Sequence, residues 1–387
     1  MSNPGEAPAL LYTEDEDELR TTVRKFLADR ASWQAVLAFT EADPLIHQST
    51  HPSPRRDDKV WRGLVEVGVP GLAVPESLGG AGASWREVAV VAEELGRAVA
   101  PTPFLGSTVL ATAALLGVHA LGEVDVAGTV GELAAGTRTA ALAVPVSTAP
   151  AEGPFGAVTV AADGSLSGTV TSVADAATAG VLVVPAAGDA GPGLYLVEAA
   201  DARVEPFLTL DLTRGLANVT FDAAPARLLA AGEPAAVALS GALVTGAAVL
   251  ASEQLGVAER CLELTVEHLR SRYQFGRPLG SFQGLKHRLA DLWVAIAQAR
   301  ATARYAADRV ATQDEDAADA AAVAQAHGSP VAVRAAEECV QMHGGLGFTW
   351  EHPAHLYLKR ARSDAVALGT ADRHRSRLAE LVDLPPM

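Results

Sequence analysis

The residues best suited to chemistry lie in two short segments of the C-terminal third. The first, Ser271–Gln283, places a guanidinium, an amide and aromatic rings close together. An arginine fork can bind a pyrophosphate through two parallel hydrogen bonds, and exposed rings offer apolar surface for an adenine. The candidate binding residues of this segment are Arg272, Gln274, Phe275, Phe282 and Gln283, with Lys286 on the same face of the following helix as Gln283.

The second segment, Gln341–Phe348, contains paired glycines at Gly344 and Gly345, directly after Gln341, Met342 and His343. Glycine lets the backbone approach a cofactor closely and adopt a positive φ. A glycine pair also ends helices, so the segment alone leaves both interpretations open. We expect His343 to be a packing or hydrogen-bonding residue rather than a proton carrier.

Together the two segments resemble the segments with which members of the acyl-CoA dehydrogenase family bind the AMP half of FAD. Residues 289–291, 351–353 and 360–362 follow in the family's order, and the resemblance extends to the loop and helix at 68–97. It implies FAD as the cofactor and an oligomer, because in this family these elements hold a flavin seated mainly in a neighbouring subunit. The cofactor-binding residues implied are Arg272, Gln274, Phe275, Phe282, Gln283, Gln341, Met342, Gly344 and Gly345.

The catalytic half of the same site differs from the family. Members carry Glu-Gly-Thr where this chain has Leu368, Gly369 and Thr370, so no catalytic residue is predicted. A base must reach the α-proton of the acyl thioester, and leucine cannot serve. A minority of the family places the glutamate on the helix before Arg272, but residues 243–249 contain no acid.

Three further family elements are absent. Residues 144–150 lack the Thr-Glu-Pro and Gly-Ser-Asp sequences, residues 167–173 lack the tryptophan of the strand beside the flavin ring, and the Asp-x-x-Arg that faces CoA is missing. The losses gather in the half of the site that performs the reaction.

Three hypotheses remain open. In the first, the chain is a subunit of an α2β2 acyl-CoA dehydrogenase, resembling the glutamate-lacking subunit of actinobacterial enzymes that act on steroid side-chain CoA thioesters. A homologous partner would supply the glutamate and most of the acyl-CoA site, with an electron-transferring flavoprotein as acceptor. In the second, a homotetrameric flavoenzyme uses a relocated base, Glu253 or Asp372; we otherwise expect Glu253 to be a solvated or interfacial helix residue. In the third, the chain is a non-catalytic scaffold.

The hydrophobic pattern predicts an α+β fold in three parts. A helical domain over residues 1–135 includes an amphipathic helix around Leu19–Leu27 and a capping box from Ser84 to Glu87. Short β-branched runs over 136–230 predict a small β-barrel or sandwich. Helical patterns over 231–387 predict a four-helix bundle, with helices at 236–270, 282–313, 317–342 and 355–382. The resemblance implies that this part binds the AMP half of FAD and mediates oligomerisation.

Composition and short sequence patterns indicate which kinds of partner and which cellular compartment to expect. A formal charge of −16 argues against nucleic acid. Cys261 and Cys339 lie in apolar segments and are expected to be buried thiols. No metal-ligand spacing stands out, we expect no apolar run that reaches the roughly 18 residues of a membrane span, and the N-terminus does not resemble a signal peptide. We expect a cytoplasmic protein with no membrane or metal partner.

Overall fold

The N-terminal part is a cluster of helices. The computed structural model describes residues 10–42, 56–122, 124–150, 153–189 and 191–381. Thr13 and Glu16 form a capping box at the start of the first helix, and the capping box predicted at Ser84 and Glu87 is present. The helices are α1 (Glu14–Arg30), α2 (Trp33–Glu41), α3 (Asp58–Glu66), α4 (Trp85–Ala98), α5 (Thr112–Leu121) and α6 (Ala127–Ala134), with a π-helix at Phe104–Ala111 before α5.

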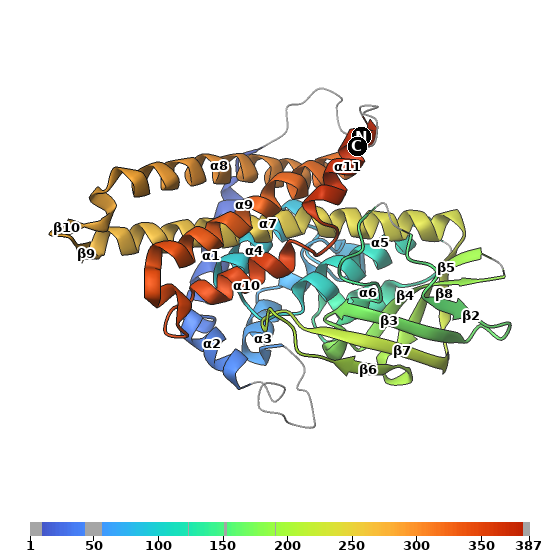
Figure 1. The fold of residues 1–387 in the computed structure, drawn as a ribbon. Coiled ribbons are helices and arrows are strands. Elements are labelled where there is room, and N and C mark those ends of the chain that lie inside the picture. The colour runs from blue at the N-terminus through green and yellow to red at the C-terminus, as the bar shows by residue number, and fades with distance from the viewer. Residues whose placement is uncertain (1–9, 43–55, 123, 151–152, 190, 382–387) are drawn as a thin grey trace.

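A mixed sheet follows, and it lies at one end of the molecule (Figure 1). Its order is β6-β7-β3-β2-β4-β5-β8, and β1 pairs in parallel with β4. The strands are β1 (Ala140–Leu142), β2 (Val158–Val160), β3 (Leu166–Ala174), β4 (Val181–Gly188), β5 (Gly191–Glu198), β6 (Arg203–Pro206), β7 (Leu216–Ala224) and β8 (Arg227–Ala231).

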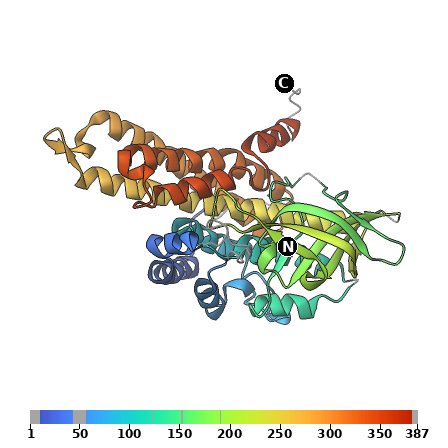
Figure 2. The same ribbon diagram turned by 60° about the horizontal axis from the view of Figure 1, so that its bottom comes forward.

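Long helices form the C-terminal part. The helix α7 (Glu233–Ser271) runs from the sheet to the far tip of the molecule, where the hairpin of β9 (Tyr273–Gln274) and β10 (Arg277–Pro278) joins it to α8 (Gln283–Ala311) (Figures 1 and 2). The helix α9 (Ala317–His343) packs against both α7 and α8. The α+β fold predicted from the sequence is confirmed.

The fourth predicted helix is wrong in one respect, because it is broken. It divides into α10 (Ala354–Asp364) and α11 (Ala371–Leu381). Between them Leu368 and Gly369 take positive φ values of 54° and 99°. The Leu368 N–H does not donate to a helical carbonyl; it donates to the Val146 carbonyl (2.7 Å). The break between the two helices thus includes a contact with the segment after β1. Val382, the predicted last residue, lies outside the described residues.

Two helical stretches are long and apolar enough to cross a bilayer, so the prediction that no such run exists was wrong. They are Phe104–Leu121 and Glu233–Ser271, among the residues that the structure describes. Buried positions make up 67% and 72% of their apolar windows. Helices in a protein core are as long and apolar as membrane spans, and the burial of these two stretches accounts for their hydropathy.

Candidate functional site

The hairpin at the tip of α7 and α8 carries the first predicted segment. Phe275 and Gly276 form its two-residue loop, with φ values of 56° and 75°. Two positive φ values are typical of a type I′ turn, but a bulky residue there is strained. The Phe275 side chain is also 86% exposed. Strain combined with an exposed ring is typical of a binding position rather than a folding one.

Arg272 is held by its backbone while its side chain stays available. Its N–H donates to the His268 carbonyl (2.8 Å), and its carbonyl accepts from the Leu279 N–H (2.9 Å). Within the described part of the chain its exposed guanidinium makes no ion pair. Gln274 and Gln283 are exposed beside it. A free cation and two free amides at one tip suit a phosphorylated ligand.

Phe282 is half-buried and is fixed from two sides. Its ring meets Phe275 edge to face, with 6.1 Å between ring centroids. The Arg277 guanidinium lies over the Phe282 ring, 3.8 Å from the centroid. Arg277 was missed as a candidate, although it lies within the same sequence segment. The pair of rings presents an ordered apolar surface.

The second segment ends α9. Gln341 is exposed, and Gly344 has φ 60° and ψ −135°, a combination that only glycine adopts readily. A Cβ added at Gly344 or Gly345 would meet nothing within 4 Å, so this backbone faces open space. Met342 is the exception among the predicted residues, because its side chain is buried and only its backbone can reach a ligand.

A stack of histidines brings the two segments to the same end of the helical layer. The ring centroids of His268 and His343 are 4.3 Å apart, and those of His343 and His352 are 4.1 Å apart. His343 Nδ1 is 2.7 Å from the Cys339 carbonyl oxygen. His343 is thus a buried packing and hydrogen-bonding residue. Burial and the neighbouring His343 lower the pKa of His352 to about 4.

Leu368, at the position where the resemblance expects glutamate, is fully buried in hydrocarbon. A Cβ built on Gly246 would lie 3.0 Å from Leu368 Cδ1 and 2.4 Å from Leu110 Cδ2. Gly246 of α7 therefore faces Leu368, and it belongs to the helix segment where a minority of the family keeps its base. Both possible positions for an acid are occupied by residues that cannot remove a proton.

Glu253 is held by two arginines and is not a free base. It is buried and ion-paired, which corrects the expectation of a solvated or interfacial residue. Its carboxylate accepts from Arg214 (2.6 Å) and from Arg360. Burial raises its pKa, but the two guanidiniums outweigh burial and hold that pKa below its ordinary value. Glu253 therefore ties α7 to α10 and to the segment before β7.

The remaining members of this buried ion network come from elements far apart in the chain. Arg360 also pairs with Asp211 (2.6 Å), and Arg214 pairs with Asp364 (3.0 Å). Burial, followed by the charge on Glu253, raises the pKa of Asp364 to about 8. The other candidate base, Asp372, is exposed in the first turn of α11 and pairs with Arg375 (2.6 Å). Among the described residues, no group of three His, Cys, Asp or Glu side chains could hold a metal ion.

Comparison with known proteins identifies the family. The acyl-CoA dehydrogenase N-terminal domain matches residues 13–123, and the C-terminal domain matches residues 235–382. The acyl-CoA dehydrogenase IpdE2 of Mycobacterium tuberculosis (strain ATCC 25618 / H37Rv) is 38% identical over 92% of this chain and 93% of its own length. The chain belongs to the acyl-CoA dehydrogenase family. IpdE2 of Mycolicibacterium smegmatis is 36% identical over 95% of this chain and 98% of its own.

Solved structures of the family share the whole fold. A variant of the Tcur3481–Tcur3483 steroid ACAD superposes with a TM-score of 0.82 at 31% identity, over 96% of this chain and 98% of that one. The ChsE4–ChsE5 complex from Mycobacterium tuberculosis gives 0.83 at 30% identity, over 98% and 100%. The resemblance to steroid acyl-CoA dehydrogenases is therefore confirmed.

FAD is the cofactor of this family, and the exposed tip fits part of it. The free guanidinium of Arg272, the ordered rings of Phe275 and Phe282, and the open backbone at Gly344 and Gly345 suit a pyrophosphate and an adenine. The side chains that face Gly246, those of Leu110 and Leu368, offer apolar contact and no carboxylate, while the buried His374 places its Nε2 3.0 Å from the Leu368 carbonyl oxygen. The residues present thus fit the AMP half of FAD better than the catalytic half of the site.

Proposed function

We propose that this chain is a subunit of an FAD-dependent acyl-CoA dehydrogenase of α2β2 composition and completes a site in a homologous partner. The observation that carries the proposal is the burial of Leu368 against Gly246 and Leu110, which leaves hydrocarbon where a base is needed. The partner would provide the glutamate that removes the α-proton and bind most of the acyl-CoA. Bound FAD would accept the hydride from the β-carbon.

The residues of this chain would bind and orient one end of the flavin. Arg272 would hold the pyrophosphate by two parallel hydrogen bonds, supported by the amides of Gln274, Gln283 and Gln341. Phe275 and Phe282 would cover the adenine. Gly344 and Gly345 would let the backbone approach closely, because no side chain intervenes.

The finer assignments belong to the same proposal. A steroid side-chain CoA thioester is the substrate class that we propose, supported by the 31% identity to a steroid acyl-CoA dehydrogenase structure. An electron-transferring flavoprotein is the acceptor that we propose, and the cytoplasm is the compartment.

The experiment is the flavin content of the complex with a glutamate-bearing homologous chain, co-expressed and co-purified. Arg272→Ala should weaken FAD binding by roughly 10- to 100-fold, since charge-assisted hydrogen bonds contribute about 1.5–3 kcal/mol each. Arg270→Ala is the matched control. It removes an exposed arginine from the last turn of the same helix and should leave flavin content unchanged.

Turnover of an acyl-CoA distinguishes the outcomes. The proposal predicts that Arg272→Ala in this chain lowers turnover by the partner's base, with recovery at high FAD. Full flavin occupancy and full turnover in the Arg272→Ala complex would refute a role for this tip in FAD binding. Assembly of active enzyme from this chain alone would favour the homotetramer with its own base.

A further inference from the structure

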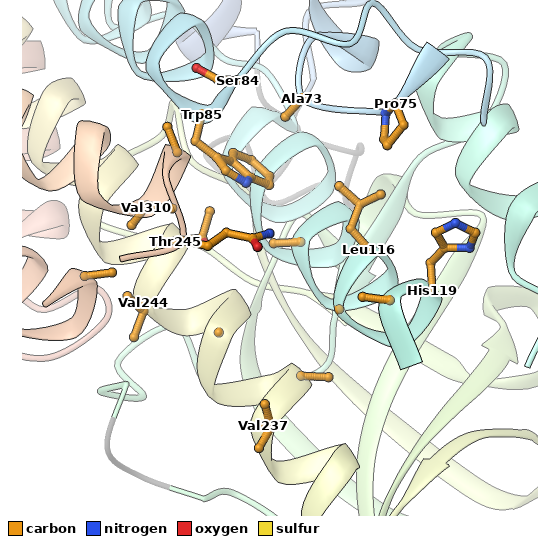
Figure 3. Close-up of a pocket in the computed structure, with 18 of the residues that line it drawn as sticks. Ala73, Pro75, Ser84, Trp85, Leu116, His119, Val237, Val244, Thr245 and Val310 are labelled. Carbon is orange, nitrogen blue, oxygen red and sulfur yellow. The ribbon is translucent and has the colours of Figure 1, made fainter. Parts of the chain in front are cut away.

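A polar pocket beside α3 differs in kind from the cavity shown in Figure 3. The cavity in Figure 3, beside Trp85 and Leu116, is walled mostly by alanine, glycine, valine and leucine. The α3 pocket has a volume of about 460 Å³, and its walls come from the start of α3, the turn between α6 and β1, and the turn before β4. Small-molecule sites typically measure roughly 300–1,000 Å³. The α3 pocket is therefore of a size to hold one small ligand.

The charge in the lining of the α3 pocket is opposite to the charge of the whole chain. Arg56, Arg62 and Arg138 line it, with Asp58 as the one carboxylate among the lining residues that the structure describes. The whole chain carries a formal charge of −16. Charges of one sign gathered in a hollow raise the local concentration of ligands of the opposite sign. The α3 pocket is therefore suited to an anion.

Arg62 and Arg56 have unused hydrogen-bond donors. The Arg62 side chain is exposed, and within the described ranges it makes no hydrogen bond or ion pair. Asp58 lies one helical turn before Arg62, but its carboxylate accepts from Arg56 Nε instead (2.8 Å). No described residue bonds the two terminal nitrogens of Arg56. Two guanidiniums with available donors suit a phosphate, whose oxygens accept parallel hydrogen bonds.

Arg138 forms an ordered wall of the α3 pocket. Its guanidinium donates to Glu132 (3.3 Å), to Glu198 and to the Gly180 carbonyl oxygen (3.1 Å). Its side chain lies across Gly180, where an added Cβ would be 2.9 Å from Arg138 Cγ and Nε. A wall that is ordered before a ligand arrives lowers the entropic cost of binding.

The threonines of the lining offer acceptors rather than donors. Thr178 Oγ1 donates to the Asp175 carbonyl oxygen (3.1 Å). Thr137 Oγ1 donates to the Glu132 carbonyl oxygen (3.1 Å). A hydroxyl has one hydrogen and two lone pairs, so each oxygen can still accept a hydrogen bond. These oxygens therefore suit hydroxyl groups of a ligand, whereas a phosphate suits the arginines.

We propose that the α3 pocket binds a small phosphorylated molecule that also carries hydroxyl groups, of the sugar-phosphate class. The phosphate lies between Arg56 and Arg62, and hydroxyl groups of the ligand donate to Thr137 and Thr178. The site is independent of the proposed FAD-binding role, because it shares no residue with the tip of α7 or with the segment that ends α9.

The test is isothermal titration calorimetry of the full chain with ribose 5-phosphate, ribose and inorganic phosphate. Ribose 5-phosphate makes both sets of contacts, so it should bind saturably and at least about 10-fold more tightly than either of the other two. Absence of saturable binding would overturn the proposal. Equal affinity for inorganic phosphate and ribose 5-phosphate would also overturn it, because the threonines would then make no contact.

Arg62→Gln removes charge-assisted hydrogen bonds and should weaken the binding of ribose 5-phosphate by at least about 10-fold. Lys59→Gln is the matched control, since Lys59 is exposed on the same helix but does not line the pocket. Its affinity should equal that of the parent. Equal weakening by both variants would contradict the proposal, because attraction between net charges would then explain the binding.

Asp58→Asn should change the affinity in the opposite direction, which a loss of folding cannot imitate. It removes the carboxylate beside Arg56 and should tighten the binding of ribose 5-phosphate about 5-fold. Thermal unfolding of each variant checks that the fold is kept. Folded Arg62→Gln and Asp58→Asn proteins that bind as the parent does would show that the ligand lies elsewhere and would overturn the proposal.

Discussion

The tip of α7 and the surroundings of Leu368 lie in the same helical layer but are built in opposite ways. The tip leaves Phe275, Arg272 and two glycines unburied, in part at the cost of a strained backbone. Around Leu368, the side chains of Leu110 in the π-helix and of Leu368 itself close on the backbone of α7 at Gly246. The tip leaves polar and aromatic groups exposed, whereas the region around Leu368 is closed by its own side chains. This contrast is what the proposed role, binding FAD without supplying the base, requires of the chain.

The largest expected effect tests whether Glu253 has a structural or a catalytic role. Glu253→Gln leaves Arg214 and Arg360 without their shared carboxylate, and breaking a buried ion pair costs about 3–5 kcal/mol. Urea unfolding should show that loss. Asp372→Asn, at an exposed carboxylate, should change the unfolding free energy by less than about 0.5 kcal/mol. A Glu253→Gln complex that is fully stable but inactive would instead identify Glu253 as the base.

The next effect concerns the hydrocarbon around Leu368. Leu368→Glu places a carboxyl in this apolar site and should lower the unfolding free energy by roughly 2–4 kcal/mol. Leu368→Met keeps the volume and should cost less than about 1.5 kcal/mol. Thermal or urea unfolding measures both. A stable Leu368→Glu chain that dehydrogenates acyl-CoA alone would mean that the site is still shaped for a base.

A smaller effect tests the tip, where stability and binding should move in opposite directions. Phe275→Gly removes the penalty of a bulky residue at φ 56°, so the isolated chain should unfold no more easily than the parent. It also removes an aromatic contact worth about 0.5–1.5 kcal/mol. FAD should therefore bind the complex up to about 10-fold more weakly, as measured by flavin fluorescence. Unchanged FAD affinity would mean that the ring serves another contact.

The last test of the comparison is a pH dependence of stability. Folding raises the pKa of Asp364 from 3.8 to about 8, so the folded chain binds this proton more tightly than the unfolded chain does. The unfolding free energy should therefore fall as pH rises through that window, by at most about 1.4 kcal/mol per pH unit, and level off above it. Asp364→Asn should show a shallower slope in urea titrations. An equal slope in both proteins would assign the dependence to other groups.

The sequence predicted correctly those features that depend on residues close together in the chain. The capping box at Ser84 and the amphipathic pattern around Val23 depend on residues within a few positions, and both were confirmed. The helix break between Asp364 and Ala371 was missed although Gly369 is a local signal for it; the hydrogen bond from Leu368 to Val146, far away in the chain, has no such local signal. Composition alone cannot show such a contact.

The same limit applies to Glu253. Its partners Arg214 and Arg360 lie on other elements, and each looks like an ordinary surface residue in the sequence. The candidate FAD-binding residues could be proposed because they lie in two short segments, whereas the ion network could not be predicted. Whether these candidate residues contact FAD stays a prediction.

The most direct test of the central claim is the solution mass and flavin absorbance of this chain, purified alone and with a glutamate-bearing homologous chain. The account predicts a colourless chain alone, and a yellow α2β2 complex with one FAD for every two chains. A yellow homotetramer of this chain alone, with one FAD per chain and acyl-CoA dehydrogenase activity, would contradict it.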